Sequence, residues 1–269
     1  MPWVIKAKGY DPNQPRAEDG KWSDGGAGAG PAGEGTLRTR NFDEAVQALA
    51  GGRAVELETA EDAYTLVDRM YEFTQEAQAK GEKAPNLDLC SVSVPGTNLF
   101  CGDNIGIERA EMPQLSGQPR PGSPADSLPK NDRGEVNIGE AFTDRLSEMG
   151  VDVSDRTVPA ASLRASQKEL VGANVAWMMN NGEKIGLSEG RIFVSSDGYV
   201  IDGHHRWAAL VSLDARDGGL GDVPINVQQI GMPISQVLQF ANEFADEIGV
   251  MPKAAKRRVP LGVRAYMTW

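Results

Sequence analysis

The stretch RIFVSSDGYVIDGHHRWAAL, residues 191–210, carries the clearest structural signal in this chain. Its first part predicts two short strands that turn at residues 197–198, because an Asp-Gly pair between apolar runs favours a hairpin. The second strand leads through Gly203 into a helix that begins around His204. A helix N-terminus preceded by glycine presents free backbone N–H groups, and Arg206 adds a guanidinium in the first turn. The stretch therefore predicts an anion-binding site.

His204 and His205 are the two histidines of the chain, so any imidazole chemistry must come from this loop. Adjacent residues point in different directions. We therefore expect the two rings to do different jobs, one toward a ligand and one toward the sheet. The alternative is that both histidines only cap the helix and pack against their surroundings.

The sequence around this stretch alternates between strand and helix patterns. Strands are expected at residues 157–159, 192–201 and 224–230, and helices at residues 166–179, 204–213 and 234–248. This order predicts an α+β (α/β-like) domain over residues 151–250, with a compact mixed sheet and packed helices. The last helix carries its apolar residues on one face and is expected to cover the sheet.

A further α+β region is expected at residues 41–115. Helices are predicted from Phe42 and from Thr59 to about Ala79, with strands near residues 55–57 and 87–94. Thr59 followed by two acidic residues is typical of a helix N-cap. Residues 116–150 are expected to form a linker with a short helix, residues 142–149. We find no catalytic set in this half and expect it to contact a partner or to have a structural role.

The two ends of the chain have unusual compositions. Residues 1–40 are rich in Gly and Ala and cannot bury enough apolar surface to fold alone, so they predict a flexible leader. Residues 251–269 form a basic tail, for which the plain interpretation is a solvated segment. Residues 10–22 resemble a short leader of many tailed-phage and prophage proteins. This resemblance implies a phage or prophage origin and a phage or host protein partner.

The overall composition excludes several classes of protein. A net charge of −11 argues against a protein that coats nucleic acid, because binding a phosphate backbone requires Lys and Arg. No stretch approaches the ~18 apolar residues of a membrane span, and the N-terminus lacks a signal-peptide pattern. We therefore expect a protein of the cytoplasm that does not enter a membrane. Cys90 and Cys101 are expected to be reduced packing residues, with a redox role as the minor alternative.

Residues 200–210, VIDGHHRWAAL, resemble the nucleotide-binding motif of the ParB/sulfiredoxin superfamily, in which a Gly-x-x-Arg loop opens a helix and holds nucleotide phosphates. Residues 158–169 resemble the opening strand, turn and polar helix start of the same superfamily, and the likeness extends over residues 157–230. A partition ParB protein is disfavoured because such proteins carry an acidic or arginine pair where this chain has two histidines. They also carry a helix-turn-helix, which is not found in this sequence. A sulfiredoxin is disfavoured because position 204 is not cysteine. The loop looks closest to that of free serine kinases.

The resemblance implies an ATP- or ADP-dependent phosphotransferase that uses Mg²⁺ and acts on a hydroxyl of a small molecule or a protein. In this interpretation Gly203, His204, His205 and Arg206 hold the phosphates, and both histidines are candidate catalytic residues. Asp202 orients the loop or binds Mg²⁺. Gln167 and Lys168 contact phosphate or substrate, and Glu169 activates the acceptor hydroxyl from a helix start.

Three alternatives remain open at the level of sequence. Glu169 is as readily explained as an exposed acid in the first turn of a helix. The whole protein can instead be a nucleotide-sensing or phage-assembly module that binds without turnover. A ParB-like nuclease is the third interpretation, and it requires several metal-binding carboxylates and a basic track.

Overall fold

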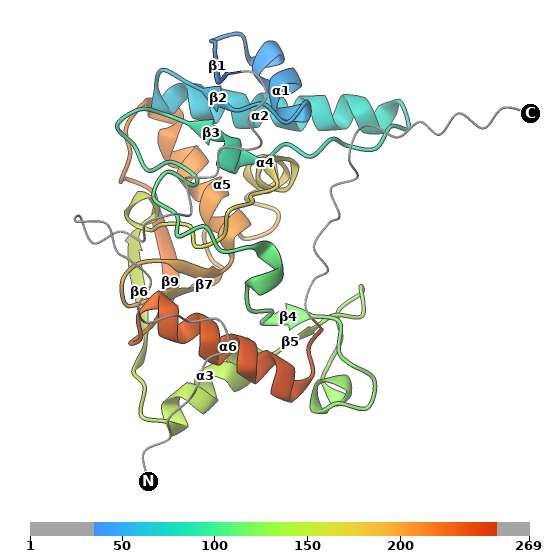
Figure 1. Ribbon diagram of the computed structural model, residues 1–269, viewed down its shortest axis with the longest axis vertical. Coiled ribbons are helices and arrows are strands. Elements are labelled where there is room, and N and C mark those ends of the chain that lie inside the picture. Colours follow the sequence, from blue (N-terminus) through green and yellow to red (C-terminus); the bar gives the residue numbers. More distant parts are fainter. Residues whose placement is uncertain (1–34, 252–269) are drawn as a thin grey trace, which may run out of the picture.

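The computed structural model describes residues 35–251 and has the α+β fold expected from the sequence (Figure 1). Residues 1–34 of the expected leader and residues 252–269 of the basic tail lie outside the described residues, whereas residues 35–40 of that leader are described and include the strand Leu37–Arg38. The helices are α1 (Phe42–Ala50), α2 (Ala60–Ala79), α3 (Gly139–Glu148), α4 (Gly172–Asn180), α5 (His204–Asp214) and α6 (Ile234–Ile248).

The main sheet is mixed and has four strands in the order β6-β9-β7-β8. The long strands β6 (Val153–Pro159) and β9 (Pro224–Ile230) pair antiparallel, from Val153 opposite Ile230 to Pro159 opposite Pro224. Strand β7 (Arg191–Ser195) runs parallel to β9, and β8 (Val200–Asp202) returns antiparallel to β7. The hairpin predicted at residues 197–198 is therefore present, and it places the end of β8 directly before α5.

Two smaller sheets belong to the first half of the chain. One has three parallel strands, each of two residues: β1 (Leu37–Arg38), β2 (Val55–Glu56) and β3 (Val92–Ser93). The other pairs β4 (Ser116–Gly117) with β5 (Val136–Asn137) in antiparallel fashion. The predicted N-cap of α2 is confirmed, because Thr59 and Asp62 exchange side-chain hydrogen bonds with each other's backbone N–H groups at 3.1 and 2.9 Å.

The main sheet separates two apolar cores. Alternate side chains of a strand face opposite sides of a sheet, so Val200 enters one core and Ile201 the other. The first core lies against α2, α4 and α5, and the second lies against α3 and α6 (Figure 1). The first core includes Met70 and Leu89 from the first half of the chain as well as Trp207. Residues on both sides of the expected linker thus share one core.

The helix expected at residues 166–179 begins later, at Gly172. Residues before it are extended because they pair with distant segments: Gln167 bridges to Ile107, and Val171 bridges to Asp88. These partners satisfy backbone groups that a helix would have satisfied internally. The strand expected at residues 87–94 is also corrected, because residues 89–91 form a short 3₁₀ helix ahead of β3.

Within residues 35–251, no helix is both long enough and apolar enough to cross a membrane.

Candidate functional site

A cavity of about 210 Å³ lies at the N-terminus of α5. Its wall combines the end of β8, the first turn of α5, residues 109–114 of the first half of the chain, and single residues from two other segments. The lining residues are Arg109, Met112, Pro113, Gln114, Gln167, Met178, Ile201, Asp202, Gly203, His204, His205 and Arg206. The structure therefore brings six of the eight predicted site residues to one cavity.

Gly203 shapes the entrance to α5 by adopting a left-handed conformation with φ of 94°. Its N–H donates to Asp202 Oδ1 at 2.8 Å, which fixes the carboxylate beside the turn. A Cβ atom at position 203 would lie 2.8 Å from Ile192 Cβ and closer still to Ile192 Cγ2. Glycine is thus required by both the backbone conformation and the available space. The first-turn N–H groups of a helix lack intrahelical acceptors, and they carry the positive end of the helix dipole.

His204 is buried and holds the chain segment opposite α5. Its Nε2 accepts the backbone N–H of Ser166 at 3.3 Å, and the Ser166 hydroxyl lies 3.0 Å from the same atom. That hydroxyl also donates to the Val200 carbonyl at 2.6 Å. Burial, together with the charges of His205 and Arg109, lowers the pKa of His204 from 6.5 to about 3. The imidazole is therefore neutral near pH 7 and offers no positive charge to a phosphate.

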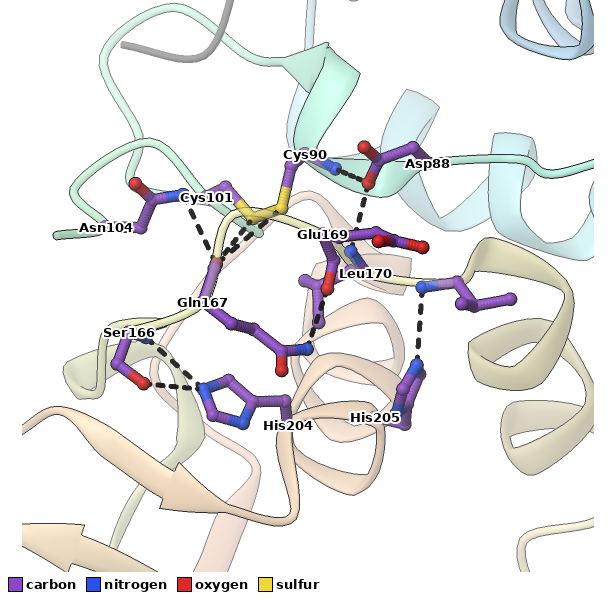
Figure 2. Close-up of a disulfide and its surroundings, with 11 residues drawn as sticks. Asp88, Cys90, Cys101, Asn104, Ser166, Gln167, Glu169, Leu170, His204 and His205 are labelled. Atoms are coloured by element: carbon purple, nitrogen blue, oxygen red, sulfur yellow. Dashed lines mark hydrogen bonds between the residues drawn. A yellow bond between two sulfur atoms is a disulfide. The ribbon is translucent and has the colours of Figure 1, made fainter. Parts of the chain in front are cut away.

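His205 contacts the other end of the same segment. Its Nε2 accepts the backbone N–H of Val171 at 3.3 Å, whereas His204 binds Ser166 (Figure 2). The two rings thus hold residues 166–171 from both ends. These bonds are the kind expected if the histidines cap and pack. A direct role of either ring toward a ligand stays a prediction.

Arg206 lines the cavity and also supports the turn before β7. Its Nη1 donates to the carbonyl oxygens of Gly186 and Leu187 at 2.8 and 2.7 Å. Gly190 leaves room for the guanidinium, because a Cβ there would lie 2.7 Å from Arg206 Nη2. Burial lowers the pKa of Arg206, but a guanidinium remains protonated in proteins. Arg206 therefore adds a positive charge to the wall while its position is fixed by backbone carbonyls.

Arg109 is the charged residue of the site that sequence reasoning missed. It lies in a short 3₁₀ helix, Arg109–Glu111, and its charge contributes to the lowered pKa of His204. No local motif marks it, because it reaches the cavity only through the folding of the first half onto α5. With Arg206 it places two guanidinium groups against the single carboxylate of Asp202. The wall is thus positively charged in a chain of net charge −11.

Lys168 and Glu169 are the two predicted site residues that do not line the cavity. The Lys168 ammonium pairs with the Glu108 carboxylate. Glu169 is half-buried, and its backbone carbonyl accepts a hydrogen bond from Gln167 Nε2 at 2.7 Å. Both residues belong to the extended segment rather than to a helix start, so the geometry assumed for Glu169 is not the one observed.

Cys90 and Cys101 are not reduced, contrary to the expectation from sequence. They form a disulfide with a Cα–Cα distance of 4.9 Å, beside the extended segment (Figure 2). A count of two cysteines argued only against a framework of several disulfides. It could not show that the turn after β3 returns Cys101 to the neighbourhood of Cys90. No free cysteine remains among the described residues.

The cavity offers limited support for a metal ion. Asp202 is its one carboxylate, and the described part of the chain contains no cluster of three or more His, Cys, Asp or Glu residues that could hold a metal. Mg²⁺ commonly binds proteins through one or two carboxylates together with substrate phosphates. These residues therefore fit a Mg²⁺ ion that arrives with a nucleotide, with Asp202 as the protein ligand, but not a resident metal centre.

The fold and the cavity together define an α+β protein with a positively charged, glycine-headed helix N-terminus. No family model, curated protein or solved structure matches this chain. The resemblance to the ParB/sulfiredoxin superfamily therefore stays a hypothesis that rests on residues 157–230.

Proposed function

We propose that the cavity at α5 binds the phosphate groups of ATP or ADP and that the protein is a ParB/sulfiredoxin-like phosphotransferase. The observation that supports this is the convergence of Arg109 and Arg206 on the helix N-terminus that Gly203 opens. Anions bind well at such helix ends, and guanidinium groups are suited to phosphate oxygens. Two guanidinium groups beside one helix N-terminus favour an anionic ligand.

The size of the cavity indicates which part of a nucleotide enters it. Pockets that enclose a whole small molecule usually measure about 300–1,000 Å³. The cavity at α5 holds about 210 Å³. It therefore suits the phosphate groups, with the nucleoside outside the cavity.

Transfer of a phosphoryl group depends mainly on positioning and on neutralising negative charge. In the proposed reaction Arg109, Arg206 and the first turn of α5 hold the transferred group. Bound Mg²⁺ would neutralise further phosphate charge, with Asp202 as its protein ligand. The acceptor is a hydroxyl of a small molecule or a protein. Because Glu169 lies outside the lining, we propose that charge neutralisation, rather than a general base, contributes most to the transfer.

Binding without turnover is the second candidate function, and one observation favours it. Glu169, the predicted proton acceptor, lies outside the lining of the cavity, and His204 uses Nε2 to accept the Ser166 N–H. A nucleotide-sensing module needs no such group. A phage-assembly role of that module, and a cytoplasmic location of the protein, remain parts of the proposal that rest on the sequence.

The test compares nucleotide binding and turnover in the native chain and two variants. Titration calorimetry with ATP and ADP in the presence of Mg²⁺ measures affinity, and labelled nucleotide detects transfer. Loss of one charged hydrogen bond costs about 1.5–3 kcal/mol, so Arg109→Gln should weaken binding roughly ten- to a hundredfold. The matched control is Arg216→Gln, an exposed arginine just beyond the opposite end of α5, which should bind normally.

Three outcomes are decisive. Saturable binding with transferred label, both weakened by Arg109→Gln alone, supports the phosphotransferase. Saturable binding without product supports the sensing module. Absence of binding to either nucleotide, or equal weakening in the two variants, would overturn the assignment of the cavity.

A further inference from the structure

The Cys90–Cys101 disulfide links two segments of the chain, and each segment forms hydrogen bonds with residues 166–171. It closes a loop of sequence separation 11, and each cysteine is half-buried, so a small reductant can reach it. These are the only cysteines of the chain. The extended segment carries Gln167, which lines the cavity, and it is the segment that both histidines bind.

The segment around Cys90 fixes the C-terminal end of residues 166–171. The Leu89 N–H donates to the Leu170 carbonyl at 2.9 Å. The Leu170 N–H donates to Asp88 Oδ1 at 3.0 Å, and the same oxygen accepts the Cys90 N–H at 3.0 Å (Figure 2). A displacement of Cys90 would therefore act directly on Leu170, which precedes the residue that His205 binds.

The segment that follows Cys101 fixes the other end. The Ile107 N–H donates to the Ser166 carbonyl at 2.9 Å, and the Lys168 N–H donates to the Ile107 carbonyl at 3.0 Å. Two residues further along the chain is Arg109, which lines the cavity. The disulfide thus joins the two segments that lie against residues 166–171. Because it holds Cys101 in place, it also restrains the path of the chain toward Arg109.

The sulfur atoms also contact the extended segment directly. Each Sγ lies 3.9 Å from the Gln167 carbonyl oxygen, which Asn104 Nδ2 approaches at 3.4 Å (Figure 2). A disulfide sulfur has no proton to donate, so these are contacts rather than hydrogen bonds. A thiol is a weak donor. In the reduced state each Sγ–H could donate to this carbonyl, so the surroundings suit both redox states.

We propose that the Cys90–Cys101 pair is a reversible redox switch that controls the cavity at α5. In the forward step a dithiol reductant supplies two electrons and two protons, the S–S bond breaks, two S–H bonds form, and the reductant leaves as its own disulfide. The oxidised state holds the chain before Arg109 and favours ligand binding. The reduced state loosens residues 101–109 and weakens it.

The rarity of disulfides in the cytoplasm agrees with a redox switch. Disulfides are rare in the cytoplasm, and those that occur there are usually transient and catalytic or redox-sensing. A permanent structural bond is therefore a poor explanation for a single pair in a chain for which we propose that location. The effect on nucleotide affinity rests on the proposed function, whereas the loosening of residues 101–109 does not.

The experiment measures backbone hydrogen exchange of the full chain, oxidised and after dithiothreitol, with ATP affinity measured in parallel. We expect reduction to speed exchange at least severalfold in residues 101–109 and 166–171 and to leave α6 unchanged. ATP affinity should fall severalfold, and reoxidation should restore both. Cys90→Ser/Cys101→Ser should reproduce the reduced state and no longer respond to dithiothreitol.

Each contrary result has a distinct meaning. Unchanged exchange in residues 101–109 overturns the switch whatever the ligand. Loss of protection throughout the protein, α6 included, overturns it in favour of a structural disulfide. Faster local exchange with unchanged ATP affinity overturns the control of the cavity. Failure of the oxidised chain to bind ATP or ADP counts against the proposed function, and the exchange data then decide the conformational switch independently.

Discussion

Replacing Gly203 by alanine tests the structural reason for the glycine at the head of α5. Two costs add together in this variant. A side chain in the left-handed conformation, with φ of 94°, costs roughly 1–2 kcal/mol. The new Cβ would also overlap Ile192, whose side chain is buried in the first core, and overpacking costs about 1–3 kcal/mol. We therefore expect Gly203→Ala to lower the free energy of unfolding by about 2–5 kcal/mol.

Gly198→Ala is the matched control for this prediction. Gly198 has a similar positive φ of 82°, but no heavy atom lies within 4 Å of the position where its Cβ would be. Only the backbone cost applies there, so we expect a loss of roughly 1–2 kcal/mol. The difference between the two variants isolates the overlap with Ile192.

Urea denaturation followed by far-ultraviolet circular dichroism measures both variants. The free energy of unfolding is extrapolated to water, and unchanged slopes show that the unfolded states are comparable. Equal losses in Gly203→Ala and Gly198→Ala would refute the reasoning, because they would show that Ile192 does not restrict position 203. A loss below that of the control would have the same meaning.

Two further predictions concern buried ring nitrogens. Burial lowers the pKa of His204 from 6.5 to about 3, so the unfolded chain binds a proton in that pH range that the folded chain does not. His204 should therefore reduce the free energy of unfolding as pH falls below 6.5, by up to about 1.4 kcal/mol per pH unit. Urea midpoints measured between about pH 4 and pH 8 should depend less steeply on pH in His204→Gln than in the native chain. An equal dependence on pH in the two proteins would contradict this. Trp207→Phe removes the indole N–H that donates to the Ala160 carbonyl at 2.9 Å, and should cost about 1–3 kcal/mol in thermal or urea unfolding. The exposed Trp177→Phe should change stability by less than about 0.5 kcal/mol, and equal effects at the two tryptophans would show that the buried bond is unimportant.

The elements that could be predicted from the sequence are those with a complete local signal. The predicted strand at residues 224–230 and the predicted helix at residues 234–248 have the same bounds in the structure. The hairpin before His204 was marked by its Asp-Gly turn, and the helix after it by Gly203. In each case the hydrogen bonds or apolar spacing that define the element involve residues close together in the chain.

The candidate site was predictable only in part for the same reason. Gly203, the two histidines and Arg206 form one local motif, so they were found together. Glu169 was misplaced because residues 166–171 have a polar composition that suits a helix start. Their actual conformation depends on Asp88 and Ile107, which are far away in the sequence.

The sequence by itself determined the α+β class, the glycine-headed start of α5 and the loop most suited to an anion. Only the tertiary structure decided that Arg109 joins Arg206 at the cavity, that residues 166–171 are extended, and that Cys90 meets Cys101. The physical reason is that local hydrogen bonds and apolar periodicity depend on neighbours in the chain. Cavities, disulfides and bridges between distant segments depend instead on how the first half packs into the core that it shares with α4 and α5.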